Sequence, residues 1–280
     1  GNDEIYVEEF IPRARHIEVQ VVSDRKGGVT HLWDRECSVQ RRFQKVVEIA
    51  PVPNLSDDIR KEIIDASISL ARHVGYSNIG TFEFLVRVSE SNEAGSFAFI
   101  ETNARLQVEH TVTEVVTGVD VVQTQIQLAQ GESLSEIGLD SQETINPRGF
   151  AIQTRVNMET LSPSGNLRPS GGMLISYDPP AGPGVRTDGF GYSGYTTNAL
   201  FDSLLAKVIA YSSSPQFECA VGKSLSSLSE FRIEGVDTNI GFLKNVLNHP
   251  DFMDGSVHTR WVDENLKTLA VVDELDGDRR

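Results

Sequence analysis

The 280-residue chain carries 40 acidic and 25 basic residues, a net charge of −15, and 39% hydrophobic residues. This composition is typical of a soluble globular protein with one or two domains. The negative charge disfavours nucleic-acid binding, and no apolar run approaches the ~20 residues that a membrane-spanning helix needs. Two cysteines and a polar start without a secretory signal favour the cytoplasm, or the mitochondrial matrix in a eukaryote.

Strand patterns dominate the start of the chain. Apolar and polar residues alternate over residues 4–11 and again over 16–22, which predicts two strands. Because a strand pattern begins almost at the first residue, we expect the chain to start inside a longer domain. Gly27-Gly28 predicts a hairpin turn into a short strand at 29–33. Residues 34–52 are polar and basic, and predict no regular element.

Helices and strands then alternate up to a glycine at residue 131. The expected elements are a helix, two strands joined by a loop, and a second helix, at 56–75, 81–88, 97–101 and 120–131. Ser56 and Asp120 occupy N-cap positions, and Gly75 and Gly131 are the glycines expected at the two helix C-termini.

The composition changes after residue 131. A polar stretch at 132–147 precedes a strand pattern, a segment rich in glycine and proline, and two helical patterns, at 150–156, 163–194, 216–231 and 238–248. We therefore expect an α+β fold. Its predicted parts are a first domain, a smaller second domain and an acidic tail, at 1–135, 146–270 and 271–280.

The most informative segment runs from Phe99 to His110. Polar residues recur there at every second position, so an extended backbone would place them on one face: Glu101, Asn103, Arg105, Gln107 and Glu109. Burying such a set without partners would cost several kcal/mol, which favours a polar cleft with a ligand. The alternative is a solvated strand face with surface ion pairs.

A second segment places Glu83 between two phenylalanines of a predicted strand. If Val88 pairs with Ser96 across the loop, Glu83 lies opposite Glu101. Two carboxylates directly opposite each other destabilise a sheet unless a cation lies between them. Mg²⁺ prefers oxygen ligands, and Asn103 could add one. The alternative is a different register, in which Glu83 makes an ordinary salt bridge.

A third segment is basic. Arg41, Arg42 and Lys45 place three cations within five residues of an acidic protein, which favours an anion site. The alternative is a solvated basic loop.

Together these segments resemble the biotin carboxylases, the ATP-grasp enzymes of acetyl-CoA, propionyl-CoA and pyruvate carboxylation. The most specific motif is the run Glu-x-Asn-x-Arg-x-Gln-Val-Glu-His at 101–110. Further matching motifs follow in the order of the family and extend the resemblance over nearly the whole chain, at 15–20, 34–42, 80–84, 184–186, 195–203 and 236–239. The implied fold is the C-terminal part of an ATP-grasp domain, an antiparallel sheet with helices, followed by the smaller biotin carboxylase C-terminal domain.

The resemblance also implies roles for individual residues. Glu109 would be the base that deprotonates bicarbonate, and Arg186 the cation that stabilises the biotin enolate. Lys45 and Arg105 would complete the catalytic set. The implied bicarbonate-binding residues are Lys45, Arg105, Gln107 and the backbone of Val108. The implied ATP-binding residues are Glu8, Ile11, His16 and Gln40. The implied ligands of Mg²⁺ or Mn²⁺ are Glu83, Glu101 and Asn103.

The reaction implied by the resemblance joins ATP and bicarbonate to carboxyphosphate, which carboxylates biotin on a biotin carboxyl carrier domain. A carboxyltransferase domain or subunit would then use the carboxybiotin, and a homo-oligomer is expected.

The family's glycine-rich lid is absent from these residues, so the family's N-terminal half would precede Gly1, and the chain alone is expected to be inactive. Phe43 stands where the family usually has a histidine near the nucleotide, and Glu9 where a lysine is common.

Two rival functions remain open from the sequence. The chain could be a non-catalytic dimerisation or docking module, although a degenerate copy has no reason to keep both Glu101 and Glu109. It could also belong to another ATP-grasp ligase, against which Arg186 and the second domain argue.

Overall fold

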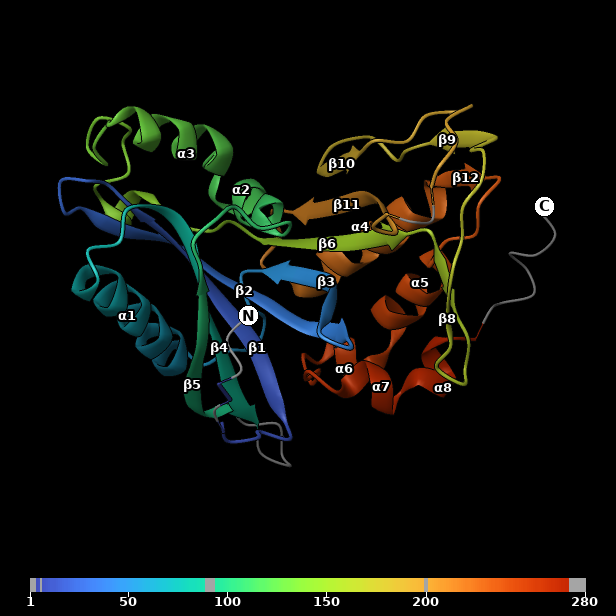
Figure 1. The fold of residues 1–280 in the computed structure, drawn as a ribbon, viewed down its shortest axis with the longest axis horizontal. Helices are drawn as coiled ribbons and strands as arrows, with labels where there is room; N and C mark the ends of the chain where they lie inside the picture. Colours follow the sequence, from blue (N-terminus) through green and yellow to red (C-terminus); the bar gives the residue numbers. More distant parts are fainter. Residues whose placement is uncertain (1–3, 6, 89–93, 199–200, 272–280) are drawn as a thin grey trace.

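One antiparallel sheet of eight strands runs through both halves of the protein (Figure 1). The computed structural model describes residues 4–5, 7–88, 94–198 and 201–271. In their order across the sheet, the strands are β10 (Val185–Gly189), β11 (Leu204–Ser212), β6 (Phe150–Asn157), β3 (Gln44–Ala50), β2 (Val29–Arg41), β1 (Ala14–Ser23), β4 (Asn78–Val88) and β5 (Ala94–Asn103). The expected α+β fold, an antiparallel sheet with helices, is confirmed.

Helices cover both faces of this sheet. The helices are α1 (Asp57–His73), α2 (His110–Thr117), α3 (Val121–Gln130), η1 (Gln142–Thr144), α4 (Phe217–Glu230), α5 (Ile240–Asn248), α6 (Pro250–Met253), α7 (Trp261–Glu264) and α8 (Leu266–Leu269). Two small two-stranded sheets pair β7 (Glu159–Leu161) with β8 (Leu167–Pro169), and β9 (Ser176–Asp178) with β12 (Arg232–Glu234). Among the described residues, none of these helices has the length and apolar character that crossing a bilayer requires.

Alternation along the strands separates an apolar face from a polar one. In β1, Ile17, Val19 and Val21 are fully buried and pack in the cluster that α1 covers. In β6, Ile152 packs in the cluster of the C-terminal helices, whereas its neighbour Gln153 accepts a hydrogen bond from α2 on the other face. The face covered by α1 and the C-terminal helices holds the two largest hydrophobic clusters, and the other face carries polar side chains beside α2 as well as two smaller apolar clusters.

Local signals predicted the helix ends well. Ser56 is the N-cap of α1, with its hydroxyl accepting from the N–H of Ile59, and Gly75 has a left-handed φ of 61° after that helix. Asp120 caps α3 in the same way, and Gly131 ends it with a φ of 95°. These predictions are confirmed, because caps and C-terminal glycines depend on a few neighbouring atoms.

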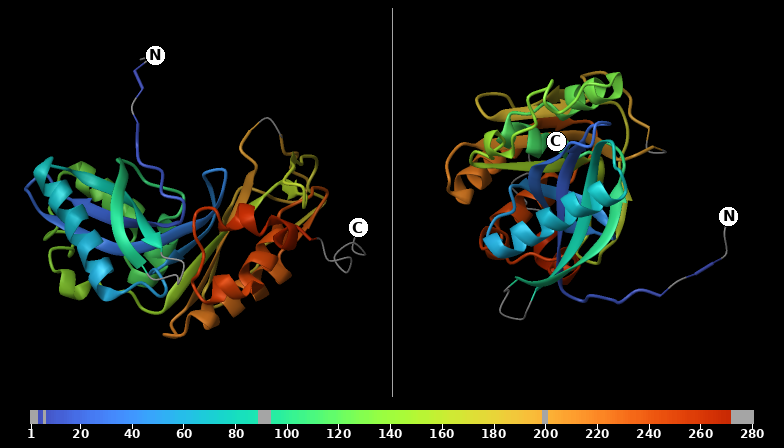
Figure 2. Two further views of the ribbon diagram at one scale, coloured as in Figure 1. Left: turned by 90° about the horizontal axis from the view of Figure 1, so that it is seen from below. Right: turned by 90° about the vertical axis from the view of Figure 1, so that its left-hand side faces the viewer.

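Two strand predictions near the start are wrong. Residues 4–5 and 7–11 form no strand and are mostly exposed, since no neighbouring strand pairs with them; Figure 2 shows this segment leading away from the body. Residues 34–52, predicted to be irregular, contain most of β2 and all of β3. Their polar side chains misled the prediction, because Arg35, Gln40 and Lys45 bond to Glu18 and His16 of strand β1.

The expected domain boundary is not a break in the sheet. β3 pairs with β6, so the sheet continues from the first predicted domain into the second. Val47 and Ile49 of β3 pack in the same cluster as α4 and α5. The predicted tail, 271–280, lies outside the described residues except for Val271.

Candidate active site

Three carboxylates form a row across the polar face of the sheet. Glu18 of β1 lies directly opposite Glu83 of β4, and Glu83 lies directly opposite Glu101 of β5. Like charges in such positions destabilise a sheet. The sequence predicted the pair Glu83 and Glu101 but missed Glu18, whose alternation with Ile17 and Val19 already placed it on this face.

Two cations, Arg35 and Lys45, compensate the negative charge of Glu18 at one end of the row. Arg35, which is 0% exposed, donates to Glu18 Oε1 at 2.5 Å. The Nζ atom of Lys45 lies 2.6 Å from Glu18 Oε2 and 3.7 Å from Glu83 Oε2. Burial alone would raise the pKa of Glu18, but Arg35 and Lys45 hold this pKa down to about 2. Glu18 is therefore a buried anion at neutral pH.

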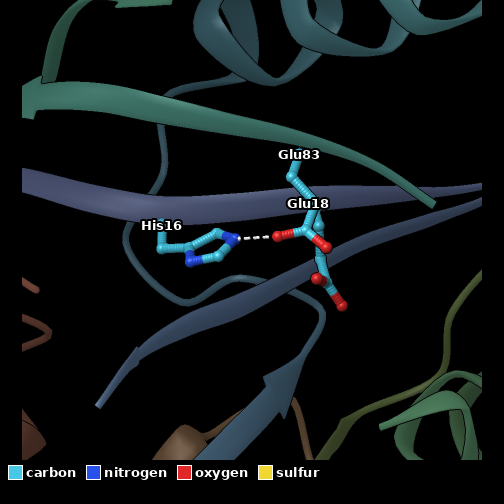
Figure 3. Close-up of side chains that lie close together, drawn as sticks. All are labelled: His16, Glu18 and Glu83. Atoms are coloured by element: carbon cyan, nitrogen blue, oxygen red, sulfur yellow. Dashed lines mark hydrogen bonds and ion pairs between the residues drawn. The ribbon is translucent and has the colours of Figure 1, made fainter. Parts of the chain in front are cut away.

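Glu83 is held from several sides. His16 Nε2 lies 2.6 Å from Glu83 Oε2, as Figure 3 shows. Gln107 donates to Glu83 Oε1 at 2.7 Å. Burial raises the pKa of Glu83, but the hydrogen bond from His16 and the charge of Lys45 lower it to about 2. The protein therefore fixes this carboxylate as an anion with a defined orientation.

The predicted pair of metal ligands lies on one face. Glu83 and Glu101 are directly opposite, as expected, and the side-chain amide of Asn103 donates to both, at 2.7 and 2.9 Å. The assumed pairing of Val88 with Ser96 is wrong, since Val88 pairs with Ala94. Two irregularities in the β4–β5 ladder lie beyond Glu83 and leave its partner unchanged.

This donor set fits a magnesium ion. Two carboxylates and an amide carbonyl are oxygen ligands of the kind that Mg²⁺ and Mn²⁺ accept. The amide N–H₂ group of Asn103 lies between the carboxylates of Glu83 and Glu101, so turning the amide over would present its oxygen to the same point. A second group of possible ligand atoms, within 4.8 Å of one another, comes from His16, Glu18 and Glu83, where Lys45 already supplies a positive charge.

The predicted base, Glu109, is 2% exposed and immediately precedes α2. Each of its carboxylate oxygens has its own cation. Lys45 Nζ lies 2.5 Å from Oε1, and Arg155 Nη2 lies 3.1 Å from Oε2. Lys45 therefore links the base to the carboxylate row, while Arg155 approaches from β6 of the C-terminal region.

Arg155 was missed by the sequence analysis. It also donates to Glu48 Oε1 at 2.6 Å, so its guanidinium is fixed between two carboxylates. The signal was present: if Ile152 and Thr154 face the core, Gln153 and Arg155 must face the polar side.

Arg186 is not in contact with the predicted base. Its Nε donates to Asp188 Oδ1 at 2.8 Å, and its Nη1 to Glu114 Oε2 at 2.7 Å. No contact of Arg186 among the described residues reaches Glu109. The arginine that contacts Glu109 is Arg155.

Arg105 also lies apart from the cluster. It is exposed, and its described hydrogen bond is to the carbonyl of the neighbouring Leu106, at 3.3 Å. β5 ends at Asn103, so the alternation of a strand no longer applies beyond that residue. Gln107 still reaches Glu83 because the turn after the strand brings it back.

The predicted nucleotide contacts fall into two groups. Gln40 Nε2 lies 3.3 Å from His16 Nδ1, so these two side chains stand together beside Glu83. Glu8 and Ile11 lie in the extended segment before β1, and Glu8 is exposed.

The three cations of the basic segment do not lie together. Arg41 donates to the carbonyl of Gly165, whereas Lys45 alone of the three cations enters the carboxylate cluster. Phe43 is 98% exposed in the turn between β2 and β3, where its φ is 65°. Of the predicted anion site, the structure therefore supports Lys45.

Comparisons with known proteins agree with this architecture. Residues 1–137 match the family model described as "Carbamoyl-phosphate synthase L chain, ATP binding domain", and residues 153–264 match "Biotin carboxylase C-terminal domain". The chain is 48% identical to pyruvate carboxylase 1 of Caenorhabditis elegans and 46% identical to pyruvate carboxylase of Bacillus subtilis, over 95% and 94% of its length. It spans 22% of the length of each of these relatives, about a fifth.

Solved structures lead to the same family. The biotin carboxylase domain of a single-chain bacterial carboxylase has a TM-score of 0.83 and 45% identity, covering 94% of this chain and 58% of that one. The biotin carboxylase domain of Hydrogenobacter thermophilus 2-oxoglutarate carboxylase, solved with MgADP, ADP and bicarbonate, has a TM-score of 0.85 and 39% identity, covering 95% and 56%. The chain therefore belongs to the biotin carboxylase family, with an ATP-grasp region followed by the family's C-terminal domain.

Proposed function

We propose that this chain carries part of the active site for the ATP- and bicarbonate-dependent carboxylation of biotin, in a pyruvate or acyl-CoA carboxylase. The observation that carries the proposal is the position of Glu109. Its buried carboxylate lies between Lys45 and Arg155, next to a row of carboxylates suited to a divalent cation.

The cluster would supply several of the groups that the first half of the reaction needs. Glu109 would take the proton of bicarbonate, and the oxyanion so formed would attack the γ-phosphorus of ATP, giving carboxyphosphate and ADP. Lys45, released from part of its contact with Glu109, would hold the anionic substrate. Mg²⁺ or Mn²⁺, bound by Glu83, Glu101 and Asn103, would offset phosphate charge.

For the second half we propose Arg186 as the cation that stabilises the biotin enolate. A planar guanidinium can pair with the ureido oxygen of biotin as negative charge develops there. The Arg186 side chain is 41% exposed, so a substrate can reach it once its ion pairs with Asp188 and Glu114 open. Arg155 is 18% exposed and is fixed between Glu48 and Glu109, so it would hold the base.

Paired lysine variants of the full-length protein test this assignment. Arg186→Lys should lower biotin carboxylation far more than bicarbonate-dependent ATP cleavage, because only the former needs the enolate to be stabilised. Arg155→Lys is the comparison variant and should lower both activities together, because Arg155 contacts the proposed base. A selective loss of biotin carboxylation in Arg155→Lys, with Arg186→Lys behaving as wild type, would assign the role to Arg155.

The wider assignments follow from the same proposal. ATP and biotin would be the organic substrates, with biotin presented by a carrier domain and its carboxyl group passed to a carboxyltransferase domain or subunit. We propose a homo-oligomer in the cytoplasm or mitochondrial matrix, and a domain boundary between residues 135 and 146. His16 and Gln40 would contribute to ATP binding, together with Glu8 and Ile11.

A polypeptide of these 280 residues alone is proposed to be inactive. Phosphoryl transfer depends on enclosure and positioning, and the family's glycine-rich lid is not among these residues. Purified chain should show no ATP cleavage above background when bicarbonate is added. Bicarbonate-dependent cleavage by the chain alone would refute this part of the proposal. If the full-length protein were inactive as well, the rival reading as a non-catalytic docking module would be favoured.

A further inference from the structure

Lys207 links the charged row of the C-terminal region to the backbone beside Glu109. On β11 it lies directly opposite Arg155 of β6 and Asp188 of β10. Its side chain is 12% exposed. The Nζ atom donates to the carbonyl oxygen of Val108 at 3.0 Å and lies 3.3 Å from Asp188 Oδ2. This largely buried ammonium thus donates one hydrogen bond to a loop carbonyl next to the proposed base.

That carbonyl controls the backbone of Glu109. The carbonyl of Val108 and the N–H of Glu109 belong to one planar peptide unit, so fixing one end fixes the plane of both. The Glu109 side chain leaves the chain directly after this unit. Its carboxylate is held by Lys45 and Arg155. Lys207 therefore fixes the backbone next to Glu109, while Lys45 and Arg155 hold its carboxylate.

Asp188 keeps Lys207 in place. The guanidinium of Arg186 pairs with both oxygens of Asp188, at 2.8 and 2.9 Å, which fixes the carboxylate that faces Lys207. Arg186, Asp188 and Lys207 form a continuous chain of contacts that ends at the carbonyl of Val108.

We propose that Lys207 is a positioning residue, which orients the Val108–Glu109 peptide for the bicarbonate step. The proposal rests on the function proposed above, in which Glu109 is the base. Lys207 would act only through Val108, so its loss should impair the use of bicarbonate while leaving ATP binding intact. Small displacements of a reacting group cost up to about 100-fold in rate.

Three variants of the full-length protein test the proposal. Lys207→Met removes the donor and keeps much of the side-chain volume, whereas Lys207→Arg keeps a cationic donor. The control is Lys223→Met, because the half-buried Lys223 makes the same kind of bond, to the carbonyl of Pro183 at 3.0 Å. The readouts are kcat and KM for bicarbonate-dependent ATP cleavage, and amide hydrogen exchange of residues 106–114.

For Lys207→Met we expect kcat/KM for bicarbonate to fall on the order of 10-fold to 100-fold, with KM for ATP unchanged. Exchange should quicken in residues 106–114 and not elsewhere. Lys207→Arg should recover part of the loss, and Lys223→Met should match wild type.

Two results would overturn the proposal. One is a Lys207→Met enzyme with wild-type kinetics and wild-type exchange at 106–114. The other is an equal loss for ATP and bicarbonate with faster exchange throughout the protein, which would mean a purely structural role. If wild type itself shows no bicarbonate-dependent cleavage, the proposed function fails, and the exchange data alone decide whether Lys207 holds the peptide.

Discussion

Replacing Lys45 with methionine should expose how much the carboxylate cluster depends on one ammonium. The Nζ atom lies 2.5 Å from Glu109, 2.6 Å from Glu18 and 3.7 Å from Glu83. Lys45→Met leaves these carboxylates buried with less compensation. Removing one partner of a buried ion pair costs about 3–5 kcal/mol, because the remaining charge is desolvated and unpaired.

The loss should depend on pH in a defined direction. In wild type, Glu18 and Glu83 have folded pKa values of about 2, below the usual 4.5, so their contribution to stability is present above about pH 4.5 and is lost as pH falls toward 2. Without Lys45, burial dominates and raises these pKa values, so the folded variant takes up a proton more readily than the unfolded chain. Its deficit should therefore shrink between pH 7.5 and pH 5.5.

Urea unfolding followed by far-ultraviolet circular dichroism at those two pH values measures the effect. The control is Lys26→Met, because Lys26 pairs with Glu136 at 3.1 Å with both side chains about 60% exposed, and such pairs contribute about 0–1 kcal/mol. If Lys45→Met lost no more stability than Lys26→Met, or if its deficit grew on acidification, the electrostatic account of the cluster would be wrong.

Three further outcomes follow from the same geometry. Glu109→Gln should bind ATP normally in an equilibrium titration yet lose about 10²–10⁴-fold in turnover, since a positioned base contributes that much; near-normal turnover would place the base elsewhere. Glu83→Gln should raise the Mg²⁺ concentration needed for half-maximal ATP cleavage, and an unchanged requirement would remove Glu83 from the metal site. Gly149→Ala should destabilise the protein by more than about 2 kcal/mol in urea unfolding, because the new Cβ would overlap the carbonyl oxygen of Ser212. Gly138→Ala, also at positive φ but with nothing within 4 Å, should cost only about 1–2 kcal/mol; equal losses would show that the contact with Ser212 relaxes.

The features that sequence predicted best are those set by near neighbours. Each helix cap is a bond between near neighbours: the side chain of Ser56 or Asp120 accepts from a backbone N–H three residues further along the chain. The alternation in β1 and β6 depends only on the geometry of a strand. Even the opposition of Glu83 and Glu101 was predictable, since a short connection limits the register of β4 and β5.

The features that sequence could not supply come from distant pairings. Arg155 meets Glu109 only because β6 pairs with β3, which joins segments about a hundred residues apart in the chain. The polar segment 34–52 forms strands because its partners, among them Glu18, lie on β1. Arg105 fell outside the cluster because β5 ends at Asn103, and a strand end is poorly marked in a polar run.

The central claim is that Glu109 acts as the base for bicarbonate in a biotin carboxylase. The most direct measurement is the incorporation of radiolabelled bicarbonate into free biotin by the full-length protein, with ATP and Mg²⁺, in wild type and Glu109→Gln. We expect ATP-dependent incorporation by wild type and a loss of about 10²–10⁴-fold in the variant. Wild-type protein that binds ATP but fixes no label, or a Glu109→Gln variant that fixes it at the wild-type rate, would contradict the account.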